Sequence, residues 1–209
     1  ITRKISKSKL SDFYGAGALP INYPNKWDRI HGKSGYGIWL HGTPLDTYSR
    51  APQSSDGCIV LSNDDYEQME KYVEPGKTLI FITDAIRWAN EETIALEKKG
   101  IMKHIEQWKK HWESIDTENY LHHYSDKFTY EKGLKLADWV QKKRRINANK
   151  KWIRVKISDL AIMLYPGNQK IAMVRFRQEY SSDNLQDKMD KLQFWIKEGK
   201  KWKIIYEGV

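Results

Sequence analysis

Apolar and basic side chains alternate in the stretch Trp152-Ile153-Arg154-Val155-Lys156-Ile157. Such alternation puts one set of side chains on each face of an extended chain, so it predicts a strand with one buried face. Turn residues follow this run at 166–168 and recur at 198–200. We therefore predict an antiparallel meander in this part of the chain. The same period of two returns in three later runs, at 171–176, 191–196 and 201–205.

Upstream of these strands, apolar residues recur every three or four positions instead of every two. An amphipathic helix is predicted over 105–115, where two isoleucines and two tryptophans share one face. We predict a short second helix, capped by Asp116 or Thr117 and extending to Tyr124, and a third over about 133–147. Helices followed by a meander predict an α+β domain in which a curled sheet wraps on the helices.

The chain is expected to have three parts. Residues 1–83 are rich in Gly and Pro, and their short apolar runs at 36–40 and 78–82 predict strands joined by turns. Residues 84–103 form a charged stretch that we interpret as a linker or connecting helix. Residues 104–209 contain the α+β domain.

One short helix is predicted within the first part, over 63–73. Asn63 is the expected N-cap, acidic residues fill the first turn, and a Pro-Gly pair follows the helix. Tyr66, Met69 and Val73 fall on one face of this helix, which is therefore expected to pack on the first part of the chain.

Composition excludes several classes of protein. No apolar run approaches the roughly 20 residues of a membrane-spanning helix, and the single cysteine, Cys58, permits neither an intramolecular disulfide nor a cysteine-built metal site. Of the net charge of +9, residues 1–95 contribute 11 Lys and Arg against 12 Asp and Glu, whereas 96–209 contribute 25 against 15. The basic half favours an anionic partner, and no nucleic acid partner is expected.

Cys58 follows a polar turn and precedes an apolar run, in Ser55-Asp56-Gly57-Cys58-Ile59-Val60-Leu61. A nucleophilic thiol needs a neighbouring base, and neutral histidine is the usual one. His41 is the candidate because it ends the apolar run Ile38-Trp39-Leu40 and precedes Gly42. The alternative is a structural one, since a lone cysteine is most often a small buried apolar residue.

His41-Gly42-Thr43-Pro44, together with Ser55-Asp56-Gly57-Cys58, resembles the signature of the L,D-transpeptidase family of peptidoglycan enzymes. The resemblance extends upstream to Tyr14-Gly15 and Tyr23-Pro24-Asn25, and downstream to 76–82, where the family closes its fold with a strand. It implies a β-rich catalytic domain over 1–83. This domain is expected to be partial and N-terminally truncated, because few residues precede Cys58.

The resemblance also implies roles for individual residues. Cys58 corresponds to the thiol nucleophile and His41 to its base, while the Gly42 carbonyl resembles the acceptor that orients the imidazole. Backbone N–H groups at Gly57 and Cys58 are expected to form the oxyanion hole. Tyr23 stands where some members place a tyrosine near the substrate carbonyl.

Two further residues of the turn, Ser55 and Asp56, are assigned to the substrate-binding region. Asp56 replaces the histidine that the family usually carries, and Val60 replaces an arginine or asparagine. Asp56 is expected either to bond the turn backbone, which we favour, or to face a cationic substrate group.

The region 104–209 resembles NTF2-like domains, α+β cones with a pocket. The resemblance rests on the helical runs 108–116 and 120–128 and on the later long strands. We interpret His122-His123 as solvated or helix-packing residues, with no metal, and the basic run 141–145 as a solvated helix face. Four tryptophans are expected to pack the cone: Trp108, Trp112, Trp139 and Trp202.

Together the resemblances imply a periplasmic or envelope enzyme, with no cofactor, that acts on peptidoglycan stem peptides. The Cys58 thiolate attacks the L,D-bond between meso-diaminopimelate and D-Ala, D-Ala leaves, and a thioester forms. An amine acceptor then yields a cross-link, as in L,D-transpeptidases, and water yields a tripeptide, as in L,D-carboxypeptidases that shape helical bacteria. A non-catalytic wall-binding protein is the third alternative, because Asp56 and Val60 depart from the family pattern. An unidentified ligand of the NTF2-like pocket is a further expected partner. For a cell-wall enzyme, the basic half suits anionic glycan strands or peripheral association with an envelope surface.

Overall fold

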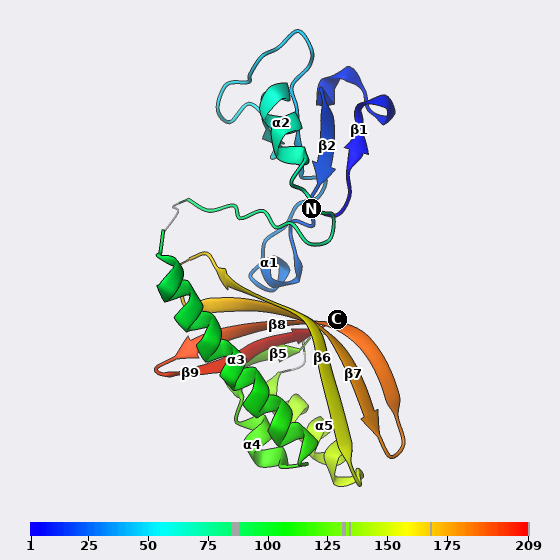
Figure 1. Ribbon diagram of the computed structural model, residues 1–209, viewed down its shortest axis with the longest axis vertical. Helices are drawn as coiled ribbons and strands as arrows, with labels where there is room; N and C mark the ends of the chain where they lie inside the picture. Colours follow the sequence, from blue (N-terminus) through cyan, green and yellow to red (C-terminus); the bar gives the residue numbers. More distant parts are fainter. Residues whose placement is uncertain (85–87, 131–132, 134, 168, 209) are drawn as a thin grey trace. The chain divides into compact units, whose positions relative to one another are not determined.

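The computed structural model describes residues 1–84, 88–130, 133, 135–167 and 169–208. The chain divides into two compact units, Ile1–Ile82 and Thr83–Val209, each with its own hydrophobic core (Figure 1). None of the described helices is long and apolar enough to cross a membrane. The α+β class predicted from the sequence is confirmed, because both units combine helices with a sheet.

The first unit contains a small four-stranded sheet in the order β1-β2-β3-β4. The pairs β1–β2 and β2–β3 are antiparallel, and β3–β4 is parallel. Two 3-10 turns follow β1, and helices α1 and α2 follow β2 and β4. The bounds are β1 Ile5–Ser6, 3-10 turns Lys7–Lys9 and Asp12–Tyr14, β2 Gly17–Pro20, α1 Lys26–Ile30, β3 Trp39–His41, β4 Ile59–Val60 and α2 Asn63–Glu70.

Helix α2 packs on this sheet through the apolar face that the sequence predicted. Tyr66 is buried with Leu19 and Leu40, and Met69 packs against them. The helix ends at Glu70, three residues earlier than predicted, so Val73 joins this core from the segment after it. The predicted N-cap is wrong by one residue, because the Ser62 side chain accepts the hydrogen bond from the third helical N–H. Asn63 is the first helical residue, and its side chain points to other segments.

The predicted strand at 78–82 is not formed. Thr78 accepts a hydrogen bond from the amino group of Ile1 at 3.0 Å, but no ladder of strand pairing continues from it among the described residues. Phe81 and Ile82 are exposed, so this apolar run lacks the neighbouring strand and the cover that a sheet requires. The run at 36–40 is also shorter than predicted, since only Trp39 and Leu40 enter β3.

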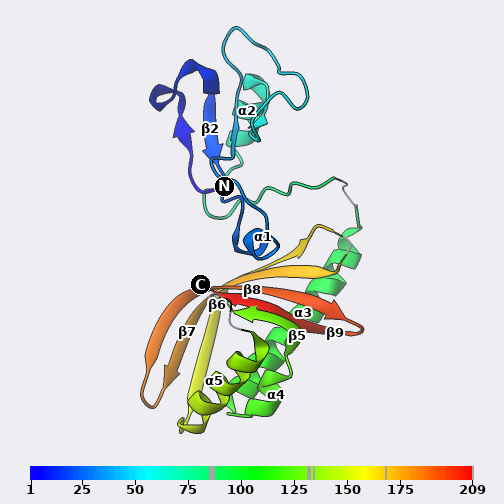
Figure 2. The same cartoon turned by 180° about the vertical axis from the view of Figure 1, so that it is seen from behind.

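In the second unit, a curved five-stranded sheet has the order β5-β9-β8-β7-β6, and three helices pack on one of its faces (Figure 2). The meander β6 to β9 is antiparallel, as predicted. Its long strands, α4 and α5 begin within a few residues of the predicted positions. The bounds are α3 Glu91–Glu113, α4 Thr117–Leu121, β5 Tyr124–Tyr130, α5 Leu136–Ala148, β6 Ile153–Tyr165, β7 Ile171–Ser182, β8 Gln186–Glu198 and β9 Lys201–Gly208.

Strand β5 corrects the prediction that Tyr124 belongs to the second helix. That helix is capped by Asp116 and ends at Leu121, and Tyr124 begins a strand that runs parallel to β9. Tyr124 fits the helical spacing and also belongs to a strand, because its ring is buried in either arrangement. Helix α3 is continuous across position 103, so residues 91–103 of the charged stretch and the predicted helix after them form one element. Residues 85–87 of that stretch lie outside the described residues.

The core of the second unit is aromatic. Trp108, Trp112, Trp139 and Trp202 are all buried, as predicted. Glu97 of α3 pairs with Lys197 of β8 at 2.7 Å and ties the helix to the sheet.

A buried polar network lies beneath this aromatic core. The carboxylate of Glu207 accepts from the Tyr124 hydroxyl at 3.0 Å and from Gln193 Nε2 at 3.0 Å, and Lys191 Nζ lies 3.3 Å away. Burial alone raises the pKa of Glu207, but Lys191 and Lys143 outweigh it, so its net pKa is lowered and it stays ionised.

Candidate active site

The two chemically active side chains of the first unit come from adjacent parallel strands. His41 ends β3, and Cys58 immediately precedes β4. The register pairs Leu40 with Ile59 and His41 with Val60. Because side chains alternate along strands, and Cys58 stands two residues before Val60, Cys58 and His41 belong to the same face of the sheet. Strand pairing therefore places two residues that are 17 apart in the sequence on the same face of the sheet.

His41 is held in one orientation. Its ring is 1% exposed, and Nδ1 lies 2.6 Å from the Gly42 carbonyl oxygen. A carbonyl oxygen only accepts, so Nδ1 carries the hydrogen and Nε2 keeps a lone pair. Burial is the largest influence on this group and lowers the pKa of His41; the Gly42 bond opposes that shift and the Arg50 charge adds to it. The imidazole is thus tuned to be a neutral base.

Aromatic rings enclose the imidazole on two sides. The Tyr14 ring meets it edge-on, with centroids 5.1 Å apart, and the Phe13 centroid lies at 5.7 Å. Arg50 belongs to the segment between β3 and β4. Its guanidinium carbon lies over the Phe13 ring, 4.4 Å from the ring centroid. Sequence reasoning missed Phe13 and Arg50, because neither belongs to a recognisable motif.

Cys58 is half-buried, and its thiol donates to the Gly37 carbonyl oxygen at 3.7 Å. No hydrogen bond joins the thiol to His41 in the described part of the chain. Ser55 Oγ donates to the Cys58 carbonyl at 2.6 Å and closes the turn that presents the thiol. The backbone N–H groups of Gly57 and Cys58 donate to no described residue, so both remain available to an incoming oxyanion.

Gly57 has a backbone that favours glycine. Its φ is +103°, and a Cβ atom there would lie 2.8 Å from Ile38 Cδ1. An L-residue at this position would strain the turn and press on the Ile38 side chain, just before β3. Glycine at position 57 therefore fits the turn that presents the thiol.

Asn63 links the site to the rest of the unit. Its Oδ1 accepts from Ala16 N at 2.8 Å, and its Nδ2 donates to the Thr43 carbonyl at 3.0 Å. Gly15 and Gly42 leave room for this side chain, since a Cβ on either would collide with Asn63 Oδ1. Asn63 of helix α2 thus holds the turn that contains His41 and Gly42. The prediction of Asn63 as an N-cap did not include this role.

The structure does not bring all of the predicted residues together. Tyr23 follows β2, is half-buried, and makes no hydrogen bond or ring contact with Cys58 or His41 among the described residues. Asp56 is exposed and bonds no described residue, so its predicted bond to the turn backbone is wrong. In place of Asp56, Ser55 supplies that bond.

Both parts of the chain match known protein families. Residues 1–82 match the L,D-transpeptidase catalytic domain, and residues 100–208 match the Cds6 C-terminal NTF2-like domain. This chain joins an L,D-transpeptidase domain to a Cds6-type NTF2-like domain. The resemblance to both families and the fold class predicted from the sequence are confirmed.

Solved structures resemble the chain over both domains. Bd1075 of Bdellovibrio bacteriovorus is 29% identical with a TM-score of 0.81, covering 99% of this chain and 73% of its own. The helical cell shape determining protein Pgp2 of Campylobacter jejuni is 29% identical with a TM-score of 0.80, covering 99% and 72%. A search of curated proteins found no match.

In the NTF2-like domain, the histidines separate as expected: His122 is exposed and His123 is buried. Among the described residues, no group of three His, Cys, Asp or Glu could hold a metal ion. The basic run 141–145 differs from the prediction of a solvated face at one residue. Lys143 turns inward, its Nζ 4.5 Å from the Trp139 centroid and 4.7 Å from that of Trp112, and burial lowers the pKa of Lys143 to about 8.

Proposed function

We propose that the L,D-transpeptidase domain is a peptidoglycan-modifying cysteine enzyme that cleaves the bond between meso-diaminopimelate and the terminal D-Ala of tetrapeptide stems. The observation that carries the proposal is the oriented, buried His41 imidazole on the same sheet face as Cys58. We assign the nucleophile to Cys58 and the base to His41. The family match of residues 1–82 supports the substrate class.

In the first half-reaction, His41 Nε2 takes the thiol proton and Cys58 Sγ attacks the carbonyl carbon at the L-centre. The resulting oxyanion accepts hydrogen bonds from the free N–H groups of Gly57 and Cys58. As the tetrahedral intermediate collapses, the carbon–nitrogen bond breaks and the imidazolium returns its proton to the leaving D-Ala amine. The products are a Cys58 thioester and free D-Ala.

For the second half-reaction we propose water as the acceptor, which makes the protein an L,D-carboxypeptidase. His41 Nε2 removes a proton from water, the hydroxide attacks the thioester, and the thiol and a tripeptide carboxylate leave. Similarity over 99% of the chain to the helical cell shape determining protein Pgp2 supports this choice. We further propose that the protein works in the cell envelope, where its substrate lies.

Arg50 is the residue we assign to substrate selection. Tetrapeptide stems end in a free D-Ala carboxylate, and Arg50 places a guanidinium beside the Phe13 and His41 cluster. A guanidinium binds a carboxylate through two parallel hydrogen bonds. Arg50 would then hold the leaving residue while Cys58 attacks the bond before it.

The test is mass spectrometry of a disaccharide-tetrapeptide incubated with the protein, with Cys58→Ala as the control. Loss of one alanine, absent in the control, supports the L,D-carboxypeptidase. Cross-linked dimers would retain the Cys58 chemistry but replace water with an amine acceptor. If the peptide stays intact while the chain pulls down with wall sacculi, the protein is a binder and the proposal fails.

A further inference from the structure

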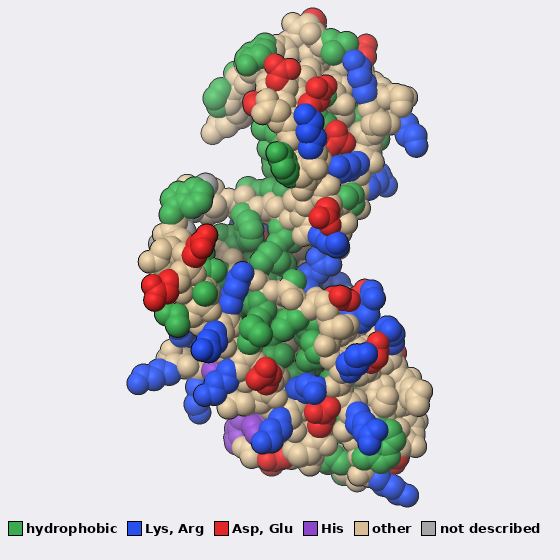
Figure 3. Space-filling view, in the orientation of Figure 1, with side chains coloured by type: hydrophobic (Ala, Val, Ile, Leu, Met, Phe, Trp, Pro, Cys, Tyr) green, Lys and Arg blue, Asp and Glu red, His purple; other side chains and the backbone are tan. Residues whose placement is uncertain are grey.

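A pocket in the NTF2-like domain, with a volume of about 380 Å³, lies apart from the Glu207 network. Helix α3, the junction of α4 with β5, and the start of β9 form its walls. Figure 3 shows histidine side chains with Lys and Arg side chains around them on the face that carries α3 and α4. The cationic and titratable residues that line the pocket are His104, His111, His122, His123, Lys201 and Lys203.

Two of the histidines form a hydrogen bond with each other. His111 Nδ1 lies 3.0 Å from His123 Nε2, so one ring donates and the other accepts. His104 directs Nδ1 to the Gly100 carbonyl at 2.8 Å and leaves its Nε2 uncommitted. Protonation of both rings would break their mutual bond, because two N–H groups would then face each other. Both rings would become donors to a ligand.

The positive charge of this pocket is not neutralised within the described residues. Lys201 forms no ion pair with any of them, and Lys203 reaches Glu198 only at 3.9 Å. Two acids stand near His122, but each has another partner. Asp116 accepts from the Asn119 side chain, and Glu118 binds Arg144 through two hydrogen bonds of 2.8 Å.

We propose that this pocket is a binding site for a phosphate group. Its donors are ammonium and imidazole groups that converge from three elements, and no arginine lines it. A planar carboxylate is served best by the two-pronged guanidinium, whereas the tetrahedral oxygens of phosphate accept from separate directions, and lysine binds phosphate as a point charge. The volume accommodates a small ligand of this kind.

Binding at this site should strengthen as the pH falls. Burial first, and then the charges of His111, His104, His122 and Lys201, lower the pKa of His123 to about 4. A bound anion opposes that repulsion and favours the protonated rings, so by reciprocity protonation favours the anion. Of the nearby carboxylates, the side chain of Asn119 lowers the pKa of Asp116, and the bonds to Arg144 lower the pKa of Glu118.

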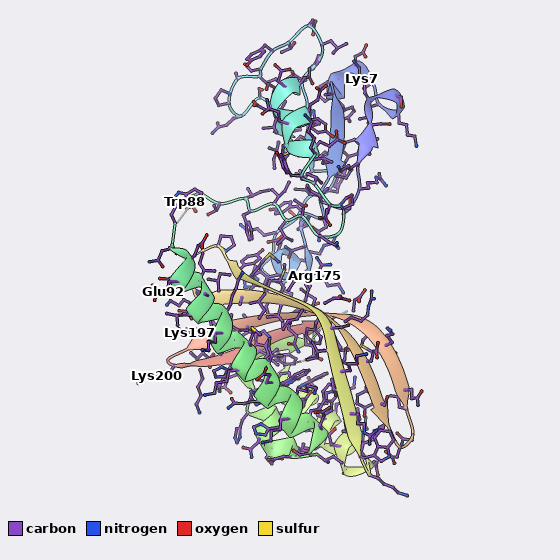
Figure 4. All side chains as sticks on the ribbon, viewed as in Figure 1. Lys7, Trp88, Glu92, Arg175, Lys197 and Lys200 are labelled. Carbon is purple, nitrogen blue, oxygen red and sulfur yellow. The ribbon has the colours of Figure 1, made fainter. Side chains whose placement is uncertain are left out.

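The experiment is calorimetric titration of the full chain with inorganic phosphate at about pH 4 and about pH 6, because the pKa of His123 is about 4 and its protonated fraction changes over this range. We expect affinity at least about tenfold higher at the lower pH, a difference of about 1.4 kcal/mol. Lys201→Gln tests the pocket, because Lys201 is exposed and its loss leaves the core intact. The matched control is Lys200→Gln, in the turn between β8 and β9 (Figure 4).

Lys201→Gln should weaken phosphate binding by about tenfold, and Lys200→Gln by less than about twofold. Equal weakening by the two variants, tighter binding of succinate than of phosphate, or no phosphate binding at either pH would overturn the proposal. Two measurements then distinguish the two sources of the phosphate group. Co-sedimentation with phosphatidylglycerol vesicles that Lys201→Gln abolishes supports a lipid headgroup, and phosphate binding without co-sedimentation supports a soluble phosphate ligand.

Discussion

The carbonyl oxygen of Gly42 accepts a 2.6 Å hydrogen bond from Nδ1 of His41, the residue just before it. This contact determines the tautomer of a ring that is almost completely buried. It leaves Nε2 as the basic atom on the sheet face shared with Cys58. The pH behaviour of the site follows from the same ring.

Alkylation of Cys58 should show an acidic limb below the ordinary histidine pKa of 6.5, because burial and the Arg50 charge lower the pKa of His41. The base is active only when neutral, so reactivity falls as pH drops through that lowered pKa. Arg50→Gln removes one of the lowering charges and should shift the limb upward. Iodoacetamide labelling rates across pH measure both; a limb at or above 6.5 in the parent protein contradicts the assignment.

Gly57→Ala should reduce the alkylation rate by about tenfold or more, because the positive φ and the approach to Ile38 force the turn to move. Gly76→Ala is the matched control: its φ is +80°, but nothing lies within 4 Å of the added Cβ. Both variants carry backbone strain, and only the first should alter the thiol. Equal rates in the two variants would show that the turn does not need glycine to present Cys58.

Asn63→Leu should destabilise the first domain by about 2–4 kcal/mol, because it leaves the Ala16 N–H and the Thr43 carbonyl without their partner. Asn63→Asp keeps the acceptor for Ala16 but sets a carboxylate oxygen against the Thr43 carbonyl oxygen, so it should also destabilise the domain. Urea unfolding followed by fluorescence measures the free energy of unfolding. An unchanged midpoint in the leucine variant would remove Asn63 from its linking role.

Acid should weaken the NTF2-like domain through His123. The folded pKa of His123 is about 4 and its ordinary value is 6.5, so between these values the unfolded chain binds the proton and the folded chain does not. The free energy of unfolding should therefore decrease as the pH falls from 6.5 toward 4. Thermal unfolding across this range measures it, and His123→Phe should flatten the dependence. A slope as steep in the variant as in the parent would assign the effect to other groups.

Glu207→Gln should destabilise the NTF2-like domain by about 3–5 kcal/mol, because it leaves the ammonium of Lys191 buried without its partner charge. The double variant with Lys191→Met removes both charges and should recover part of that loss. A double-mutant cycle on urea unfolding isolates the coupling between the two residues. Additive effects would mean that the pair does not interact.

Much of the fold could be predicted from periodicity. The runs beginning at Ile153 and Ile171 alternate cleanly because one sheet face is buried, and the aromatic face of α3 repeats at helical spacing for the same reason. Strand β5 was missed because a single buried tyrosine, Tyr124, satisfies both periods. The run at 78–82 is apolar enough for a strand, but sheet membership depends on a partner that local sequence does not contain.

The available chemistry is encoded locally: one thiol follows a Ser-Asp-Gly turn, and one histidine precedes a glycine at a strand end. The parallel pairing of β3 with β4, the hold of Asn63 on the His41 turn, the reach of Arg50 to Phe13 and the inward turn of Lys143 emerge only in the folded chain. The physical reason is that turns and amphipathic faces are encoded by neighbours along the chain. Pairing partners, burial and the pKa shifts they cause depend on residues far away in the sequence.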